Sequence, residues 1–297
     1  MRVRATTVNR TDCAYRAASP FFVRVATGLR RPRRTVLGTE FAGVVVDTGP
    51  GVTAFAVGER VFGYHEGAFG AHAEYLAIPE DAPIAAIPDG VSDEYGAAAT
   101  EGAHYALAMI RVARVRAGQR VFVHGATGGI GSAAVQLLAG LGATVTATSD
   151  TAHVDVVHGL GAERVVDHTA GDFTAGAEDA GAYDAVFDAV GKSTFGRCRR
   201  LLAPRGSYVS SDPGPGWQNL PLSAVTPLLR GRTVRFPFPR QDQAMIRGLA
   251  ERLASGAFRP LVDRHYPLDD IVAAYRYVES GRKVGNVVID VWDGEGT

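Results

Sequence analysis

The chain has 297 residues, of which 46% are hydrophobic, and its 31 basic side chains are balanced by 31 acidic ones. This length predicts two domains, or one large one, with enough apolar surface to bury a core. A net charge of zero disfavours nucleic acids and membrane surfaces as partners, because both bind proteins with a basic excess. The arginines of Arg30–Arg34 form a local basic patch, which we interpret as a solvated loop.

The two cysteines, Cys13 and Cys198, lie far apart in the sequence. Their spacing excludes a disulfide framework and a cysteine-rich zinc site. No apolar run approaches the roughly 18 residues needed to cross a bilayer. The N-terminus also lacks the hydrophobic stretch of a signal peptide, so these features predict a cytoplasmic protein.

Residues 36–88 have the pattern of a β-rich unit, in which short apolar runs are separated by glycine and proline. Such punctuation is typical of a small barrel or sandwich. We expect strands over residues 41–47, 52–57, 60–63 and 71–78.

Residues 93–114 are rich in alanine and predict a helix, after which short apolar runs alternate with helical segments. This alternation is typical of a doubly wound parallel sheet. We expect strands over residues 120–124, 144–148, 164–167, 183–190, 206–210 and 233–236. We expect helices over residues 132–141, 154–160, 193–202, 242–256 and 269–280, and a last strand over 287–291. The prediction is an α/β protein with a doubly wound domain at 93–257 and a smaller β-rich domain at 1–92 and 258–297.

The segment Ala126–Gly131 lies between an expected strand and an expected helix. Its small residues at 126, 128 and 131 match the Rossmann dinucleotide fingerprint. In that interpretation Ala126 allows the tight turn, Gly128 lets the backbone approach a pyrophosphate, and Gly131 lets the helix pack on the strand. The helix N-terminus then binds the phosphates. The predicted contacts are Ala126, Thr127, Gly128, Gly129, Ile130 and Gly131.

The end of the next strand, Thr148–Asp150, should decide between the two dinucleotides. An acidic side chain pointing inward there binds the ribose hydroxyls of NAD and repels the 2′-phosphate of NADP. We place Ser149 and Asp150 against the cofactor and predict NADPH, with NADH as the alternative. His153 is the nearest candidate partner for a phosphate, because residues 145–163 contain no lysine or arginine.

Several motifs together resemble the medium-chain dehydrogenase/reductase superfamily, and specifically its zinc-free quinone oxidoreductase branch. The matching segments are Val8–Arg16, Leu37–Gly43, Val57–Val61, Gly67–Tyr75, the glycine loop, Leu160–Ala162, Asp188–Gly191, Asp263–Leu268 and Gly285–Ile289. The resemblance implies a Rossmann domain, a GroES-like substrate domain and a homodimer formed near residues 233–238. It also implies that the substrate domain lacks its first strands, since the family places strands before the segment at Val8. A further departure is Ala14, where some relatives have tyrosine.

The resemblance bears on metal binding as well. Zinc-dependent relatives carry cysteine and histidine where this chain has Asn9 and Thr39, and their third ligand aligns near Glu101. An amide, a hydroxyl and one carboxylate do not make a credible catalytic zinc site. We therefore expect no metal, and a reductase of quinones or α,β-unsaturated carbonyls rather than an alcohol dehydrogenase.

Three residues are candidates for catalysis on this resemblance, which places the nicotinamide between the domains. Asn9 would donate a hydrogen bond to the developing oxyanion, Tyr64 would donate a proton, and Glu101 would face the reacting groups. Each has a structural alternative, namely a turn-stabilising asparagine, a packed aromatic ring and a charge at a helix N-terminus. Glu40 is expected to support its turn.

Further cofactor contacts are expected after the later strands, because loops at strand C-termini line the cofactor crevice. These are Val190, Gly191, Ser210 and Phe236, together with Asn286, which replaces the usual lysine of the family. The sequence thus predicts an NADPH-dependent quinone or enone reductase. The alternatives are a tailoring reductase or cyclase acting on a specialised intermediate, and a nucleotide-binding protein without catalysis.

Overall fold

The computed structural model describes residues 1–18, 24, 28, 33–176 and 179–292. Of the Arg30–Arg34 patch, residues 30–32 lie outside this part. The chain divides into two compact units, which are Met1–Glu101 with Gln241–Thr297, and Gly102–Arg240. Among the described residues, none of the helices has the length and apolar character to cross a membrane.

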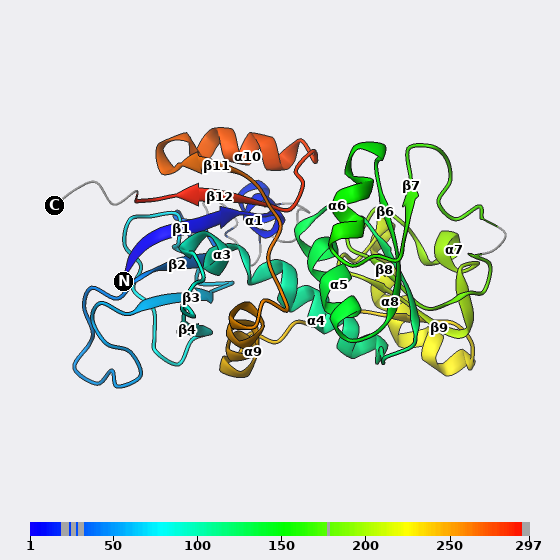
Figure 1. Cartoon of the computed structure of the whole chain (residues 1–297), viewed down its shortest axis with the longest axis horizontal. Coiled ribbons are helices and arrows are strands. Elements are labelled where there is room, and N and C mark those ends of the chain that lie inside the picture. The colour runs from blue at the N-terminus through cyan, green and yellow to red at the C-terminus, as the bar shows by residue number, and fades with distance from the viewer. Residues whose placement is uncertain (19–23, 25–27, 29–32, 177–178, 293–297) are drawn as a thin grey trace. The chain divides into compact units, whose positions relative to one another are not determined.

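The first unit is built on a six-stranded sheet with the order β11-β12-β1-β2-β3-β4 (Figure 1). The strands are β1 (Arg2–Val8), β2 (Glu40–Val44), β3 (Arg60–Tyr64), β4 (Ile84–Ala86), β11 (Val262–Pro267) and β12 (Asn286–Asp290). Strand β1 pairs antiparallel with both β2 and β12, so the beginning and the end of the described chain meet in one sheet.

Among the described residues, the α-helices of this unit are α1 (Arg10–Ala17), α3 (Asp93–Ala98), α9 (Gln243–Ala254) and α10 (Ile271–Glu279). Helix α1 begins directly after β1 because Asn9 and Asp12 form a capping box, in which each side chain binds the other residue's backbone N–H. Helix α10 buries Ala274, Tyr275 and Val278 with apolar residues of β1 and β12. A second buried cluster is formed by side chains of the sheet strands and includes Val3, Phe41 and Val61.

The second unit is a parallel six-stranded sheet with the order β10-β9-β8-β5-β6-β7. Its strands are β5 (Arg120–His124), β6 (Thr144–Ser149), β7 (Arg164–Asp167), β8 (Tyr183–Asp188), β9 (Leu202–Ser210) and β10 (Thr233–Arg235). Its helices are α4 (Glu101–Ala113), of which the first residue belongs to the other unit, α5 (Gly129–Gly140), α6 (Val154–Gly159), α7 (Phe195–Cys198) and α8 (Asn219–Val225). The order confirms the predicted doubly wound α/β fold, since the chain leaves β5 and β8 in opposite directions.

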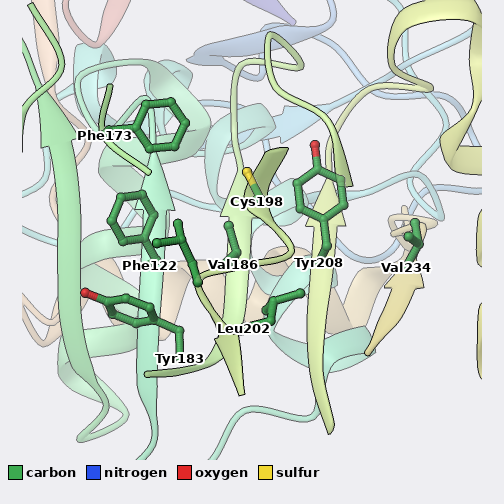
Figure 2. Packing of buried hydrophobic residues seen from close by; sticks show 9 residues of the cluster. Phe122, Phe173, Tyr183, Val186, Cys198, Leu202, Tyr208 and Val234 are labelled. Carbon is green, nitrogen blue, oxygen red and sulfur yellow. The ribbon is translucent and has the colours of Figure 1, made fainter. Parts of the chain in front are cut away.

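Aromatic side chains dominate the core of the second unit, as Figure 2 shows. Phe122, Tyr183 and Tyr208 are completely buried, and the ring of Phe122 meets that of Tyr183 edge-on with centroids 5.2 Å apart. These large rings come from three adjacent strands, so they fix the spacing between the sheet and the helices that cover it.

The two compact units have different boundaries from the predicted domains. The units divide after Glu101 and after Arg240, rather than after residues 92 and 257. Helix α3 packs on β1, β2 and β3, and helix α9 packs on β4, so both helices belong to the first unit. Alanine content predicted a helix over 93–114, which the structure divides into α3 and α4, and an amphipathic pattern predicted α9. Neither pattern could show which sheet the helices would cover.

Three predicted elements are also wrong in extent. Residues 52–57 form an irregular segment, in which the N–H groups of Thr53 and Ala54 bind the carboxylate of Glu80 instead of a neighbouring strand. Residues 71–78 contribute a single isolated bridge, between Arg2 and Tyr75. The helix expected over 193–202 is reduced to α7, and β9 begins at Leu202.

Candidate functional site

The glycine loop of the second unit is a tight turn between β5 and α5. Gly131 is buried, and a Cβ atom there would overlap the carbonyl oxygen of Gly125. The position therefore requires glycine for the helix to approach the strand. Gly128 is the N-cap of α5 with extended backbone, and it offers no side chain to the first N–H groups of the helix.

This geometry fits the pyrophosphate of a dinucleotide. A Cβ at Gly128 would meet no atom closer than the oxygen of Gly125 at 3.7 Å, so the space in front of this residue is open. Thr127, Gly129 and Ile130 are half-buried, whereas Ala126 is completely buried. Backbone N–H groups at a helix N-terminus bind phosphate because they are unpaired and carry the positive end of the helix dipole.

The next strand ends in two side chains that are already engaged. The hydroxyl of Ser149 donates to the carbonyl oxygen of Asp150 at 2.9 Å. Asp150 accepts a hydrogen bond from the backbone N–H of His153, and its carboxylate lies 2.5 Å from Nδ1 of that histidine. The carboxylate of Asp150, which could repel a 2′-phosphate, therefore has a partner in His153, three residues further along the chain.

Asp188, at the end of β8, organises the loop that carries Val190 and Gly191. This completely buried carboxylate accepts hydrogen bonds from the N–H groups of Val190, Gly191 and Ser193 at 2.9–3.3 Å, and from the hydroxyl of Tyr208. The loop backbone is thus fixed at the carboxyl edge of the sheet, where the fold binds nucleotides. This role of Asp188 was not predicted from the sequence, although the residue lies in one of the matching segments.

The remaining predicted cofactor residues are not grouped together. Ser210 is buried at the end of β9, where its hydroxyl accepts from the N–H of Asp212. Phe236 is half-buried just after β10 and packs against Phe238. Asn286 lies in the first unit, where its side chain donates to the carbonyl oxygen of Leu261 at 3.0 Å. That bond gives Asn286 a structural role.

In the first unit, Asn9, Thr39 and Glu101 form one hydrogen-bonded group. Asn9 Nδ2 donates to Thr39 Oγ1 at 2.8 Å, and Thr39 Oγ1 donates to Glu101 Oε2 at 3.5 Å. The other carboxyl oxygen of Glu101 accepts from Thr11 at 2.9 Å. The structure therefore brings together the positions that the resemblance assigned to zinc ligands. Thr11, two residues after the capping Asn9, also belongs to this group and was not predicted from the sequence.

The carboxyl of Glu101 is buried beside other acids. Glu40 is completely buried and accepts from the N–H groups of Thr100 and Glu101, at 3.1 and 2.6 Å, and from the hydroxyls of Thr7 and Thr100. Glu40 thus caps the start of α4, a structural role at a different place from the turn it was expected to support. Burial, followed by the charges of Glu40 and Asp12, raises the pKa of Glu101 well above its ordinary value.

Tyr64 is completely buried on β3, opposite Glu40 in the ladder between β2 and β3. Side chains at paired positions share one face of a sheet. Its hydroxyl donates to Glu66 Oε2 at 3.2 Å. Through this contact Tyr64 could exchange a proton with Glu66. The complete burial of Tyr64 also agrees with the alternative, a ring that only packs in the core.

No set of three or more His, Cys, Asp or Glu side chains in the described part of the chain is arranged to hold a metal ion. The side chains of Asn9 and Thr39 bind each other and Glu101 instead. Amide and hydroxyl groups are poor zinc donors beside thiolate and imidazole. Zinc-free chemistry stays a prediction, supported by this donor set.

Asp12 lies in the same cluster and predicts a pH-dependent stability. Its carboxyl is completely buried and accepts from the N–H groups of Asn9 and Gly38, yet burial raises its pKa from 3.8 to about 7. The folded protein therefore binds this proton more tightly than the unfolded chain does. The contribution to stability is complete below about pH 4, is lost as the pH rises to about 7, and amounts to on the order of 4 kcal/mol.

Urea unfolding at pH 5 and pH 8 measures this effect. We expect the urea midpoint of the wild type to be lower at pH 8 than at pH 5. The midpoint of Asp12→Asn should change less, because its side chain does not ionise. An equal fall in both proteins would show that Asp12 does not cause the dependence.

Comparison with known proteins gives matches over most of the chain. Residues 1–89 match the model of the alcohol dehydrogenase GroES-like domain, and residues 160–289 match that of the zinc-binding dehydrogenases. The second range does not include Asn9, Thr39 or Glu101.

Two curated relatives and two solved structures illustrate the similarity. The polyketide synthase GfsB of Streptomyces halstedii is 34% identical over 91% of this chain, which spans 5% of that protein. The 2-methylene-furan-3-one reductase of Solanum lycopersicum is 33% identical over 87% of this chain, which spans 64% of it. The quinone oxidoreductase of Coxiella burnetii superposes with a TM-score of 0.86, at 25% identity over 98% of this chain and 89% of that one. A mycobacterial protein solved with NADPH gives a TM-score of 0.79, at 28% identity over 98% of this chain and 90% of that one.

Proposed function

This chain belongs to the medium-chain dehydrogenase/reductase superfamily, and we propose that it uses NADPH to reduce a quinone or an α,β-unsaturated carbonyl compound without zinc. The observation that carries the proposal is the buried carboxyl of Glu101 with its raised pKa. Burial favours the protonated form of this carboxyl, and a protonated carboxyl can supply the proton that such a reduction consumes. Alcohol oxidation instead needs a base to remove a proton.

The second unit supports the cofactor. The Gly128–Gly131 turn and the start of α5 would hold the pyrophosphate, and the loop fixed by Asp188 would line the rest of the dinucleotide. When bound, the reduced nicotinamide supplies a hydride. We propose NADPH rather than NADH because the carboxylate of Asp150 is paired with His153.

The first unit supports the proton transfer. The reduced acceptor first carries a negative charge on its oxygen, which needs hydrogen-bond donors and then a proton. The amide of Asn9 uses one N–H on Thr39 and has a second to offer, and burial favours the protonated form of Glu101 as the acid. Tyr64 is the alternative proton donor, since its hydroxyl is hydrogen-bonded to Glu66, which is half-buried.

The comparisons support this choice of acceptor. The Coxiella structure is described as a quinone oxidoreductase, and the Solanum protein is named as a reductase of a 2-methylene-furan-3-one. Both names describe reduction of an activated carbonyl compound. The mycobacterial structure contains NADPH.

The test is a fluorescence titration of the purified protein with NADPH and NADH, followed by 1,4-benzoquinone, 9,10-phenanthrenequinone or 2-cyclohexen-1-one. We expect saturable binding that favours NADPH, and acceptor-dependent oxidation at 340 nm that survives extensive treatment with a zinc chelator. Tight binding without oxidation of any acceptor would contradict the proposed activity.

A second candidate is a tailoring reductase that acts on one specialised intermediate. The similarity to GfsB and to other polyketide synthases favours it. In that case NADPH would bind normally, and the simple quinones would be poor acceptors compared with an α,β-unsaturated thioester. The comparison of those two acceptor types separates the candidates.

A further inference from the structure

Lysine is rare in this chain, and one of its two lysines lies beside the proposed site. Of the 31 basic residues 29 are arginines, and the two lysines are Lys192 and Lys283. The two residue types differ chemically, because lysine presents a compact ammonium whose pKa falls readily on burial, whereas arginine stays charged and planar. A lysine in so arginine-rich a chain therefore suggests a position where the ammonium itself is needed.

The loop that carries Lys283, between α10 and β12, is fixed on both sides of it. The N–H of Val284 donates to Asp263 Oδ2 at 2.9 Å. Gly285 has a φ of +86°, and a Cβ there would overlap the carbonyl oxygen of Leu261. That same oxygen accepts from both the backbone and the side chain of Asn286, at 2.8 and 3.0 Å. A flexible surface loop would need none of these restraints.

The strand pairing places this loop next to the catalytic candidates. Val287 of β12 pairs antiparallel with Val8 of β1. The residues that lead into β12 therefore run back past the residues that follow β1, where Asn9 caps α1 and Thr11 binds Glu101. Of the acids that affect the pKa of Lys283, Glu101 has the largest influence and Glu40 the next.

The ammonium of Lys283 has donors to spare. Its Nζ atom donates to the carbonyl oxygen of Gly285 at 2.6 Å. Among the described residues it has no carboxylate partner within 4.0 Å, although it is half-buried beside two acids. An ammonium has three N–H donors, so two are available to a ligand. Burial lowers the pKa of Lys283, while Glu101, Glu40 and Asp263 oppose that shift and Arg10 adds to it.

We propose that Lys283 binds the carbonyl oxygen of the acceptor and stabilises the negative charge that hydride addition creates there. The inference rests on the proposed function and deepens it. In an enone, the hydride adds its electron pair to the β-carbon, and the C=C electrons move to form an enolate whose oxygen accepts from the Lys283 ammonium. The α-carbon then takes a proton from Glu101, and the products are the saturated carbonyl compound, the oxidised dinucleotide and a carboxylate that is reprotonated from water. A quinone takes up the same hydride and proton to give the hydroquinone.

The kinetic test compares Lys283→Met with Lys283→Arg, and uses Arg282→Met as the matched control on the same loop. For 2-cyclohexen-1-one we expect kcat/KM to fall about 100-fold in Lys283→Met, as for loss of one oxyanion donor. Lys283→Arg should recover part of the loss, and Arg282→Met should be unchanged. The Kd for NADPH should stay within about twofold in all three. An unchanged kcat/KM in correctly folded Lys283→Met would overturn the proposal.

A second measurement does not depend on turnover. Limited acetylation followed by mass spectrometry reports the reactivity of Lys283 relative to Lys192, an internal reference in the other unit. Tetramethyl-1,4-benzoquinone is a suitable ligand, since its substituted ring resists addition by amines and thiols. We expect it to slow acetylation of Lys283 and to leave Lys192 unchanged. If the wild type failed to oxidise NADPH, the proposed function would fail, and this protection would still support or overturn the role of Lys283.

Discussion

Replacing Gly131 by alanine is expected to abolish dinucleotide binding. The added Cβ would overlap the backbone of Gly125, so α5 could no longer lie against β5. The N–H groups at the start of α5 would then be displaced from the position that binds the pyrophosphate. We expect the Kd for NADPH to rise at least about 100-fold, and the protein to lose on the order of 3 kcal/mol of stability from the forced overlap.

Gly140→Ala is the matched control, because Gly140 ends the same helix, is exposed, and has no atom within 4 Å of the position of a Cβ. This substitution should leave NADPH binding unchanged and should stabilise the protein slightly. Fluorescence titration and thermal unfolding measure both effects. Normal NADPH binding by folded Gly131→Ala would show that the loop does not hold the cofactor.

Glu101→Gln is expected to reduce turnover by a factor of about 100 to 10,000, the usual range for loss of a general acid. The amide keeps an oxygen that can accept from Thr11, but it has no proton to give. The Kd for NADPH should not change. Burial favours the acid form of Glu101 by raising its pKa, so the kcat of the wild type should fall as the pH rises through that pKa. The kcat of Glu101→Gln should lack this dependence.

Glu163→Gln is a control of the same chemistry at an exposed position, and it should match the wild type at every pH. Steady-state rates with saturating NADPH, measured from pH 6 to pH 10, give the comparison. If kcat stayed high in Glu101→Gln, the proton would come from another group, and Tyr64→Phe would be the next variant to measure.

The alternating strands and helices of the second unit were predictable because their pattern is local. A short apolar run predicts a buried parallel strand, and the small residues of Ala126–Gly131 predict a turn between a strand and a helix. The errors have tertiary causes. Residues 52–57 look like a strand, but the distant Glu80 carboxylate satisfies their backbone. The boundary beyond α3 depends on which sheet that helix covers, and the sequence does not encode this locally.

The candidate catalytic group was predictable only in part. Asn9 and Glu101 came from the resemblance, and no periodicity would have placed residues 92 positions apart beside one another. Their connection runs through Thr39 and Thr11, whose hydroxyls look ordinary in the sequence. Lys283 was missed because a single lysine carries little signal until its loop is seen to be fixed and the charges around it are known.

The pairing of β1 with β12 has a consequence for synthesis on the ribosome. The second unit is one continuous segment, Gly102–Arg240, so it can fold as soon as that segment has emerged. The sheet of the first unit has to wait, because β1 gains its second neighbour only when β12 is made. Until then β1, bonded on one side at most, is exposed to pairing with other chains. We therefore expect nascent chains that end near residue 240 to contain a protease-resistant second unit and an N-terminal segment that depends on chaperones.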